Sequence, residues 1–273
     1  MYKFNQQIVL MKYAKKSLGQ NFLVDTNIIK KIINLVQIKN NNIIEIGPGK
    51  GALTDQILGK EPSSLTLIEK DNLLSKHLEL KYKKNKNVKV LNKDILKFNL
   101  EEKIKLNTII FGNLPYNISS QILVKMIRFK VWPPQYLSLI FMFQKEMAER
   151  IIGNYGSSKY GRLSILTNYR MEICSSFNVS PKCFFPSPKI ISTVLLIKPK
   201  RKSFIKIKNI KNLEMITNVL FSNKRKMINK NIKKIFKNNL DNKYIKKLNL
   251  KSRPSDLSPD TYYNLTKLFE EAN

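Results

Sequence analysis

The stretch Asn42-Ile-Ile-Glu-Ile-Gly-Pro-Gly-Lys-Gly51, followed by Ala52-Leu-Thr-Asp-Gln-Ile-Leu58, is the part of the chain that best predicts its fold. A short apolar run indicates a strand, the glycines indicate a tight turn, and the pattern from Ala52 onward is helical. This order brings backbone N–H groups and a helix N-terminus close to a nucleotide-like ligand. The glycine spacing is G-x-G-x-G and not the dinucleotide-binding G-x-G-x-x-G, so the motif is weak when taken alone.

Polar side chains follow the next three strands that the sequence predicts, at residues 64–68, 88–91 and 108–111. Glu69 lies eighteen residues after Gly51, where a carboxylate can accept hydrogen bonds from both hydroxyls of a ribose. Asp94 is placed to recognise a base edge, and the last of these strands leads to Asn113. Each residue alone is also explained as a solvated loop residue or a helix cap. Together they favour a nucleoside site at the carboxyl edge of an α/β sheet.

The chemistry is expected in the segment Ile109-Ile-Phe-Gly-Asn-Leu-Pro-Tyr116, which runs from an apolar strand into a polar and aromatic tip. Pro115 biases Leu114 to an extended conformation, which makes the Leu114 carbonyl a rigid acceptor. The Asn113 side-chain oxygen and this carbonyl can each accept one hydrogen of an aromatic amino group, while Tyr116 stacks on the ring. The nitrogen lone pair would then be directed at an electrophile. An ordinary strand and turn is the alternative, because Gly, Asn and Pro are common in turns.

Composition points to a polyanionic partner. The formal net charge is +31, from 50 Lys and Arg against 19 Asp and Glu, and such an excess favours nucleic-acid binding. Base composition of the gene is an alternative source of part of this charge, since the chain is rich in Lys, Asn and Ile. Its 273 residues, 42% of them hydrophobic, suffice for one large core and a small additional domain.

Several classes of protein are disfavoured by the sequence. No apolar run approaches the ~20 residues of a membrane span, and no signal-peptide core is recognised, so a cytoplasmic protein is expected. The two cysteines, Cys174 and Cys183, lie nine apart, and His77 is the only histidine. This argues against a structural zinc site and against a Cys-His nucleophilic pair. No metal cofactor is expected.

Seven motifs in a fixed order are far more specific than a single glycine turn. They are Leu-Gly-Gln-Asn-Phe-Leu (18–23), Glu-Ile-Gly-Pro-Gly-Lys-Gly-Ala-Leu-Thr (45–54), Ile-Glu-Lys-Asp (68–71), Phe-Gly-Asn-Leu-Pro-Tyr-Asn-Ile-Ser (111–119), Gln-Lys-Glu (144–146), Tyr-Gly-Arg-Leu-Ser (160–164) and Cys-Phe-Phe-Pro-Ser-Pro-Lys (183–189). In these motifs the chain resembles the small-subunit ribosomal RNA adenine dimethyltransferases of the KsgA type. The resemblance implies an α/β, Rossmann-like methyltransferase domain with a small all-helical C-terminal domain. It also implies dimethylation of the N6 amines of two adjacent adenosines near the 3′ end of 16S rRNA, linked to small-subunit biogenesis.

The same resemblance implies roles for individual residues. The methyl donor, S-adenosylmethionine, would contact Asn21, Leu23, Gly47, Glu69, Asp94 and Asn113. Glu69 would hold its ribose and Asp94 its adenine amino group. The residues Asn113, Leu114, Pro115 and Tyr116 would form the catalytic loop, and Phe184 would hold the target adenine against Tyr116, with Phe185 expected in the core. The partner would be small-subunit rRNA or the immature 30S subunit, and the enzyme would act as a monomer.

The chain is expected to divide at residue 200. Residues 1–200 would form the methyltransferase domain, with a basic N-terminal arm at 12–24 and a helix capped by Asp25. Residues 201–273 hold 18 Lys and Arg against 6 Asp and Glu, a net charge of +12, and their apolar spacing predicts a helical, RNA-binding domain. The segment with Lys224, Arg225 and Lys226 matches a basic helix of the resembled family. Asn223 and Lys224 stand at positions where the family favours arginine. Replacing arginine by lysine loses bidentate phosphate geometry, and a solvated face is the alternative.

Two further functions remain open. One is adenine methylation of large-subunit rRNA of the antibiotic-resistance type, which the basic helical tail and the segment 184–189 disfavour. The other is an RNA-binding assembly factor that keeps the fold without catalysis. The intact Glu69, Asp94 and loop 113–116 argue against this second alternative.

Overall fold

The computed structural model describes residues 20–202, 205–237 and 240–272, so most of the expected basic arm lies outside the described residues. The chain divides into two compact units. Among the described residues, the first unit contains those up to 123 together with 135–145 and 174–197, and the second contains 124–134, 146–173 and those from 198 onward. The second unit therefore combines the C-terminal segment with two earlier ones. The domain boundary at residue 200 stays a prediction.

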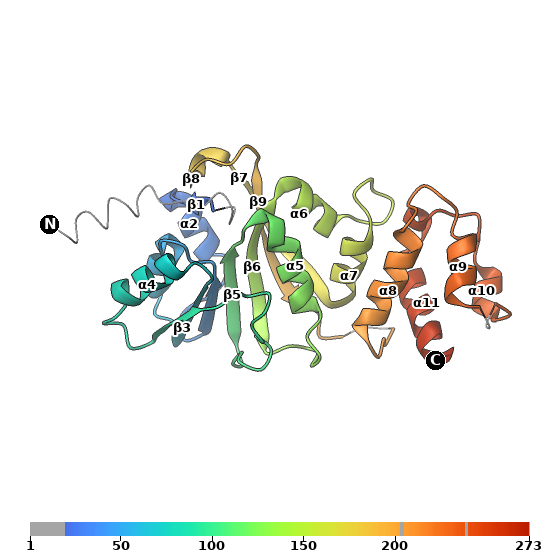
Figure 1. Ribbon diagram of the computed structural model, residues 1–273, viewed down its shortest axis with the longest axis horizontal. Coiled ribbons are helices and arrows are strands. Elements are labelled where there is room, and N and C mark those ends of the chain that lie inside the picture. The colour runs from blue at the N-terminus through green and yellow to red at the C-terminus, as the bar shows by residue number, and fades with distance from the viewer. Residues whose placement is uncertain (1–19, 203–204, 238–239, 273) are drawn as a thin grey trace. The chain divides into compact units, whose positions relative to one another are not determined.

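The first unit is organised around a sheet with the strand order β4-β3-β2-β5-β6-β9-β7 (Figure 1). Its strands are β2 (Asn42–Ile46), β3 (Ser64–Glu69), β4 (Val88–Asn92), β5 (Thr108–Asn113), β6 (Tyr136–Gln144), β7 (Met171–Val179) and β9 (Ser192–Pro199). Strands β2 to β6 run parallel to one another, and β9 is antiparallel to β6. This mostly parallel sheet confirms the predicted Rossmann-like class.

The register of the sheet places three strand ends at one level. Ile46 at the end of β2 pairs with Ile68 of β3 and with Gly112 of β5. The next residue along each strand therefore emerges at the same edge, and these residues are Gly47, Glu69 and Asn113. The pairing thus gathers the predicted site without any long loop.

Helices flank these strands: α2 (Thr26–Ile33), α3 (Ala52–Leu58), α4 (Asn72–Lys81) and α5 (Tyr116–Ile127). Asp25 caps α2 as predicted, because its Oδ1 accepts the backbone N–H groups of Asn27 and Ile28 at 2.9 and 3.0 Å. The cap fixes the chain direction just after the cavity-lining residues 20–24.

A second, two-stranded sheet joins the N-terminal segment to a distant loop. Strand β1 (Phe22–Leu23) pairs antiparallel with β8 (Phe184–Phe185), and Phe22 lies opposite Phe185. The backbone N–H of Val24 continues this connection by donating to the Cys183 carbonyl at 2.9 Å. Two of the recognised motifs, far apart in sequence, are therefore neighbours.

The second unit is helical, with α6 (Lys145–Ile152), α7 (Arg162–Arg170), α8 (Ile210–Phe221), α9 (Asn229–Ile235), α10 (Lys243–Lys247) and α11 (Pro259–Ala272). The rings of Phe221 on α8 and Tyr262 on α11 stack at 5.8 Å. The Glu270 carboxylate accepts the backbone N–H groups of Lys208 and Asn209, at 2.6 and 2.8 Å, just before α8 begins. Within the described part of the chain, none of the helices has the length and hydrophobicity needed to span a bilayer.

Candidate active site

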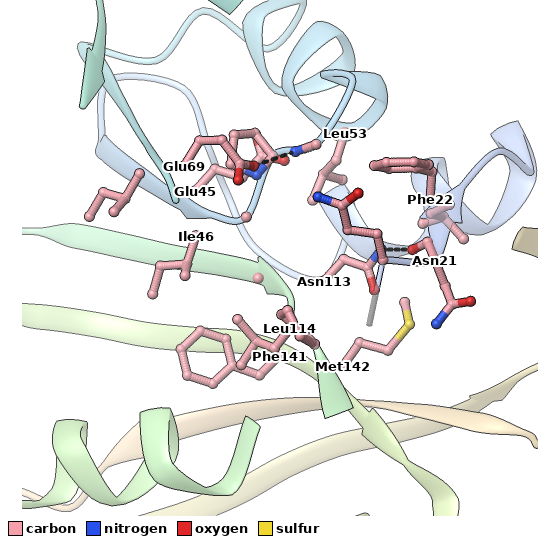
Figure 2. Close-up of a pocket in the computed structure, with 18 of the residues that line it drawn as sticks. Asn21, Phe22, Glu45, Ile46, Leu53, Glu69, Asn113, Leu114, Phe141 and Met142 are labelled. Atoms are coloured by element: carbon pink, nitrogen blue, oxygen red, sulfur yellow. Dashed lines mark hydrogen bonds between the residues drawn. The ribbon is translucent and has the colours of Figure 1, made fainter. Parts of the chain in front are cut away.

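A cavity of about 460 Å³ opens at the carboxyl ends of β2, β3 and β5. Its volume falls within the range of about 300–1,000 Å³ that is common for small-molecule sites. It is lined by all the residues that the sequence analysis assigned to the donor and by the whole loop 113–116, but not by Phe184. Figure 2 shows Glu45 and Glu69 at one end of the cavity and Asn113 and Leu114 at the other.

The glycine turn and Glu69 are held together by backbone donors. Gly47 and Gly49 have φ values of +67° and +58°, a region that L side chains adopt at a cost. The Gly49 N–H donates to Glu69 Oε2 at 3.2 Å, and the Asp71 N–H donates to Oε1 at 2.8 Å. A carboxylate oxygen has more than one acceptor position, so both oxygens can still accept from vicinal hydroxyls.

Burial and nearby charge shift the pKa values of Glu69 and Asp94 in opposite directions. Burial raises the pKa of Glu69, against the opposing effect of its backbone donors. Asp94 keeps a lowered pKa, mainly because Lys70 Nζ lies 2.9 Å from its Oδ2. Asp94 Oδ1 also accepts the Leu96 N–H at 2.9 Å, so this carboxylate is charged and held in place at neutral pH.

The loop at the other end of the cavity has a defined amide orientation. Asn113 Nδ2 donates to the Asn21 carbonyl at 3.0 Å (Figure 2), which leaves Oδ1 as the acceptor that the amide offers. Gly112 leaves room beside it for the Leu114 side chain, because a Cβ at position 112 would lie 2.6 Å from Leu114 Cδ2 and would displace it. The Tyr116 hydroxyl lies 2.6 Å from Ser192 Oγ, and burial raises its pKa. The site therefore combines a nucleoside-sized cavity with an oxygen acceptor suited to an aromatic amine.

The family model described as Ribosomal RNA adenine dimethylase matches residues 11–271 of the chain. The chain belongs to this family. The motifs that carried the resemblance in the sequence analysis all lie within the matched range.

Similar proteins support the same membership. The Ribosomal RNA small subunit methyltransferase A of Pelagibacter ubique (strain HTCC1062) is 43% identical over 261 residues, which cover 94% of this chain and 97% of that protein. The protein of the same name from Francisella tularensis subsp. novicida (strain U112) is 40% identical over 232 residues, covering 82% and 85%. A dimethyladenosine transferase from Plasmodium falciparum has a TM-score of 0.74 at 26% identity, covering 92% and 97%. The 23S rRNA methyltransferase ErmE, with a TM-score of 0.66 at 22% identity and coverage of 92% and 98%, shares the fold.

The two phenylalanines of β8 have environments opposite to those predicted. Phe184 is 4% exposed and packs in the core, whereas Phe185 is 51% exposed and lines the cavity. The prediction that Phe185 is a core residue is wrong, and the ring that faces the cavity is not Phe184. Consecutive side chains of a strand point to opposite sides, and the pairing of β8 with β1 turns Phe185 to the cavity side.

Glu45 is a cavity residue that the sequence analysis missed. Its side chain is 2% exposed, lines the cavity and accepts a hydrogen bond from the Thr54 hydroxyl at 2.6 Å. Burial raises its pKa from the ordinary 4.5 to about 7. A lone acidic residue within an apolar strand was the signal that could have identified it, because an ionisable group is rarely buried without a role.

The residues predicted to contact RNA lie in a turn and not on the helix that was expected. Lys224, Arg225 and Lys226, here called the basic turn, are exposed in the connection between α8 and α9 and not on a helix. The reason is the apolar pattern: Leu220 and Ile228 are buried, and the residues between 222 and 227 are all exposed and offer no face to pack. The described residues contain no group of three or more His, Cys, Asp or Glu that could hold a metal ion.

Proposed function

We propose that the protein transfers methyl groups from S-adenosylmethionine to the N6 amines of two adjacent adenosines near the 3′ end of small-subunit rRNA. The observation that carries the proposal is the Asn113 amide, whose Nδ2 is held by the Asn21 carbonyl at 3.0 Å, so that its oxygen is the acceptor beside the cavity. Membership in the rRNA adenine dimethylase family supports this reading. The names of the Pelagibacter and Francisella proteins support the small subunit as the source of the RNA.

The cavity residues fit the donor. When bound, S-adenosylmethionine supplies a methyl group that is already activated on a sulfonium. The Glu69 carboxylate, fixed by two backbone N–H groups, is suited to the ribose hydroxyls. Asp94 is suited to the adenine amino group, and Asn21, Leu23 and Gly47 line the remainder of the cavity. These residues bind and orient, because the chemistry of an activated methyl needs positioning more than it needs a strong base.

The loop residues act on the target amine. Asn113 Oδ1 and the Leu114 carbonyl accept its two hydrogens, which favours the tetrahedral, increasingly positive nitrogen of the transition state. Tyr116 supplies an aromatic face for a base removed from its stack, a contact worth about 1–3 kcal/mol. The second face is assigned to the β8 segment. Phe185 is the exposed ring at the cavity and Phe184 the buried one, so Phe185→Leu is expected to reduce turnover more than Phe184→Leu at equal folded fraction.

The C-terminal segment, residues 201–273, is assigned to RNA binding. Residues 201–273 carry a net charge of +12, and the basic turn is exposed. Such residues contact phosphates without reading sequence. We assign the immature 30S subunit in the cytoplasm as the substrate and a monomer as the acting form.

Methyl transfer from radiolabelled S-adenosylmethionine to small subunits that lack the modification, followed by mapping of the labelled bases, tests the proposal. Label on two adjacent adenosines is the expected result. Asn113→Ala should lower turnover by about 100-fold, as removal of one transition-state hydrogen bond commonly does, without loss of RNA affinity. Asn99→Ala is a matched control, because Asn99 is exposed and does not line the cavity.

The same experiment separates the alternatives. Label on purified large subunits, and none on small subunits, would instead assign the large-subunit reaction. An assembly factor without catalysis would bind RNA and transfer no methyl group to either subunit. Full activity of Asn113→Ala would remove the assignment of the acceptor.

A further inference from the structure

The catalytic loop is fastened at both ends by a side-chain hydrogen bond. At its start, Asn113 donates to the Asn21 carbonyl at 3.0 Å. At its end, the Tyr116 hydroxyl and Ser192 Oγ lie 2.6 Å apart. Both residues of the first contact were recognised in the sequence analysis, whereas only Tyr116 of the second contact was. The second brings in Ser192, which lies outside every motif quoted for the family.

Ser192 is a rigid point of attachment. It opens β9, pairs with Gln144 of β6, and its side chain is completely buried. The residue before it is fixed as well, because the Ile191 carbonyl accepts the Lys145 N–H at 3.0 Å. The hydroxyl of Ser192 therefore has little freedom to follow Tyr116, and Tyr116 must adapt to it.

The hydroxyl contact limits the motion of the Tyr116 ring. A tyrosine side chain has two rotatable bonds before its ring, and a hydrogen bond at the far end of the ring restrains both. Without that bond the ring keeps its area and its place at the start of α5, but its plane is free to tilt in the cavity. A tilted ring still contacts a base and no longer aligns the amine with Asn113.

We propose that Ser192 is a positioning residue for methyl transfer, whose hydroxyl holds the Tyr116 ring in the orientation that stacks on the target adenine. The inference rests on the proposed function. It predicts a loss of alignment and not a loss of donor binding, since Ser192 does not line the cavity in which Glu69 and Asp94 lie. Small misplacements of reacting groups are costly even when binding is intact.

Three variants test the inference by steady-state kinetics with small subunits as substrate. Ser192→Ala and Tyr116→Phe should each lower kcat roughly 10-fold, with the KM for S-adenosylmethionine unchanged. The double variant should be no slower than either single one, because both remove the same bond. Additive losses, or a kcat of Ser192→Ala equal to that of the unmodified protein, would overturn the proposal.

The neighbouring Thr193 supplies the matched control. Its hydroxyl donates to Asn178 Oδ1 at 2.9 Å, on the opposite face of β9 from Ser192. Thr193→Val removes a buried hydroxyl from the same strand as Ser192 and should keep the kcat of the unmodified protein. If Thr193→Val lowered kcat as much as Ser192→Ala does, any disturbance of β9 would slow the reaction. That result would overturn the specific role of Ser192.

A spectroscopic measurement reports on the contact without relying on turnover. With tyrosine labelled by ¹³C at Cζ, the Tyr116 signal is the one that disappears in Tyr116→Phe. It should shift in Ser192→Ala and stay in place in Thr193→Val, and an unshifted signal in Ser192→Ala would overturn the inference. A shifted signal with normal kcat would overturn it too, while leaving the proposed function intact. Failure of the unmodified protein to methylate any subunit would instead overturn the proposed function, and the positioning role with it.

Discussion

Gly49→Ala is expected to damage the site through one methyl group. Gly49 has φ = +58°, and a Cβ built there would lie 2.8 and 2.9 Å from two atoms of the Phe22 ring. Carbon atoms in contact prefer about 3.5–4.0 Å, so the ring must withdraw by roughly 1 Å. Phe22 follows Asn21, whose carbonyl orients Asn113. The displacement therefore reaches the acceptor as well as the wall of the cavity.

Gly156→Ala separates backbone strain from this steric effect. Gly156 has φ = +84°, with no heavy atom within 4 Å of the position of a Cβ. Both variants should lose about 1–2 kcal/mol of unfolding free energy from the left-handed backbone of an L residue. Only Gly49→Ala should also lose affinity for S-adenosylmethionine, by about tenfold or more, the equivalent of about 1.4 kcal/mol.

Urea unfolding and calorimetric titration with S-adenosylmethionine measure these two quantities on the same samples. An unchanged affinity in Gly49→Ala, at a stability loss equal to that of Gly156→Ala, would show that Phe22 moves without consequence. A weaker affinity in both variants would show that strain alone accounts for the effect. Either result would refute the reasoning that Phe22 connects the glycine turn to the loop.

Three other predictions concern charge. Because burial raises the pKa of Glu45 to about 7, the folded chain keeps a proton that the unfolded chain releases as pH rises above about 4.5. The contribution of Glu45 to the free energy of unfolding therefore falls between about pH 4.5 and pH 7. Urea unfolding at several pH values should show a smaller fall in Glu45→Gln than in the unmodified protein. Glu270→Ala removes the acceptor of two backbone N–H groups and should cost about 1–3 kcal/mol of unfolding free energy, whereas Glu271→Ala should cost less than about 0.5 kcal/mol. Alanine at all three positions of the basic turn should lower the slope of log affinity for rRNA against log salt by about 2–3, and an unaltered slope would mean that the turn is only solvated.

The strands and the glycine turn were predictable from local pattern. Apolar runs bounded by Gly, Pro and polar residues identified β2, β3, β4 and β5, and the residues that follow them line one cavity as expected. The position of these residues was predictable because the strands are parallel. The carboxyl ends of parallel strands lie at the same edge of the sheet. The family motifs supplied the other residues predicted to bind the donor, which also line the cavity. Asp25 was recognised as a cap from its residue type and its position before an apolar helical pattern.

The environment of β8 was not predictable in the same way. Which of Phe184 and Phe185 faces the cavity depends on the pairing of β8 with β1, about 160 residues away in sequence, and no local pattern encodes that register. Ser192 escaped notice for the same reason, since its contact with Tyr116 spans 76 residues. Lys224 to Lys226 were expected on a helix because the segment matches a basic helix of the resembled family, but a helix needs an apolar face to pack, and residues 222–227 are all exposed.

If Asn113 accepts a hydrogen bond from the target base as proposed, the orientation of its amide also decides which bases are rejected. With its NH₂ group donated to the Asn21 carbonyl, the amide meets an incoming base with oxygen only. Adenosine presents an amine there, whereas inosine, its deamination product, presents a carbonyl, and two facing acceptors repel without a proton between them. A ribosome whose target bases had lost their amines would pass through this site unmodified, so the methyl mark would also report that those bases are chemically intact.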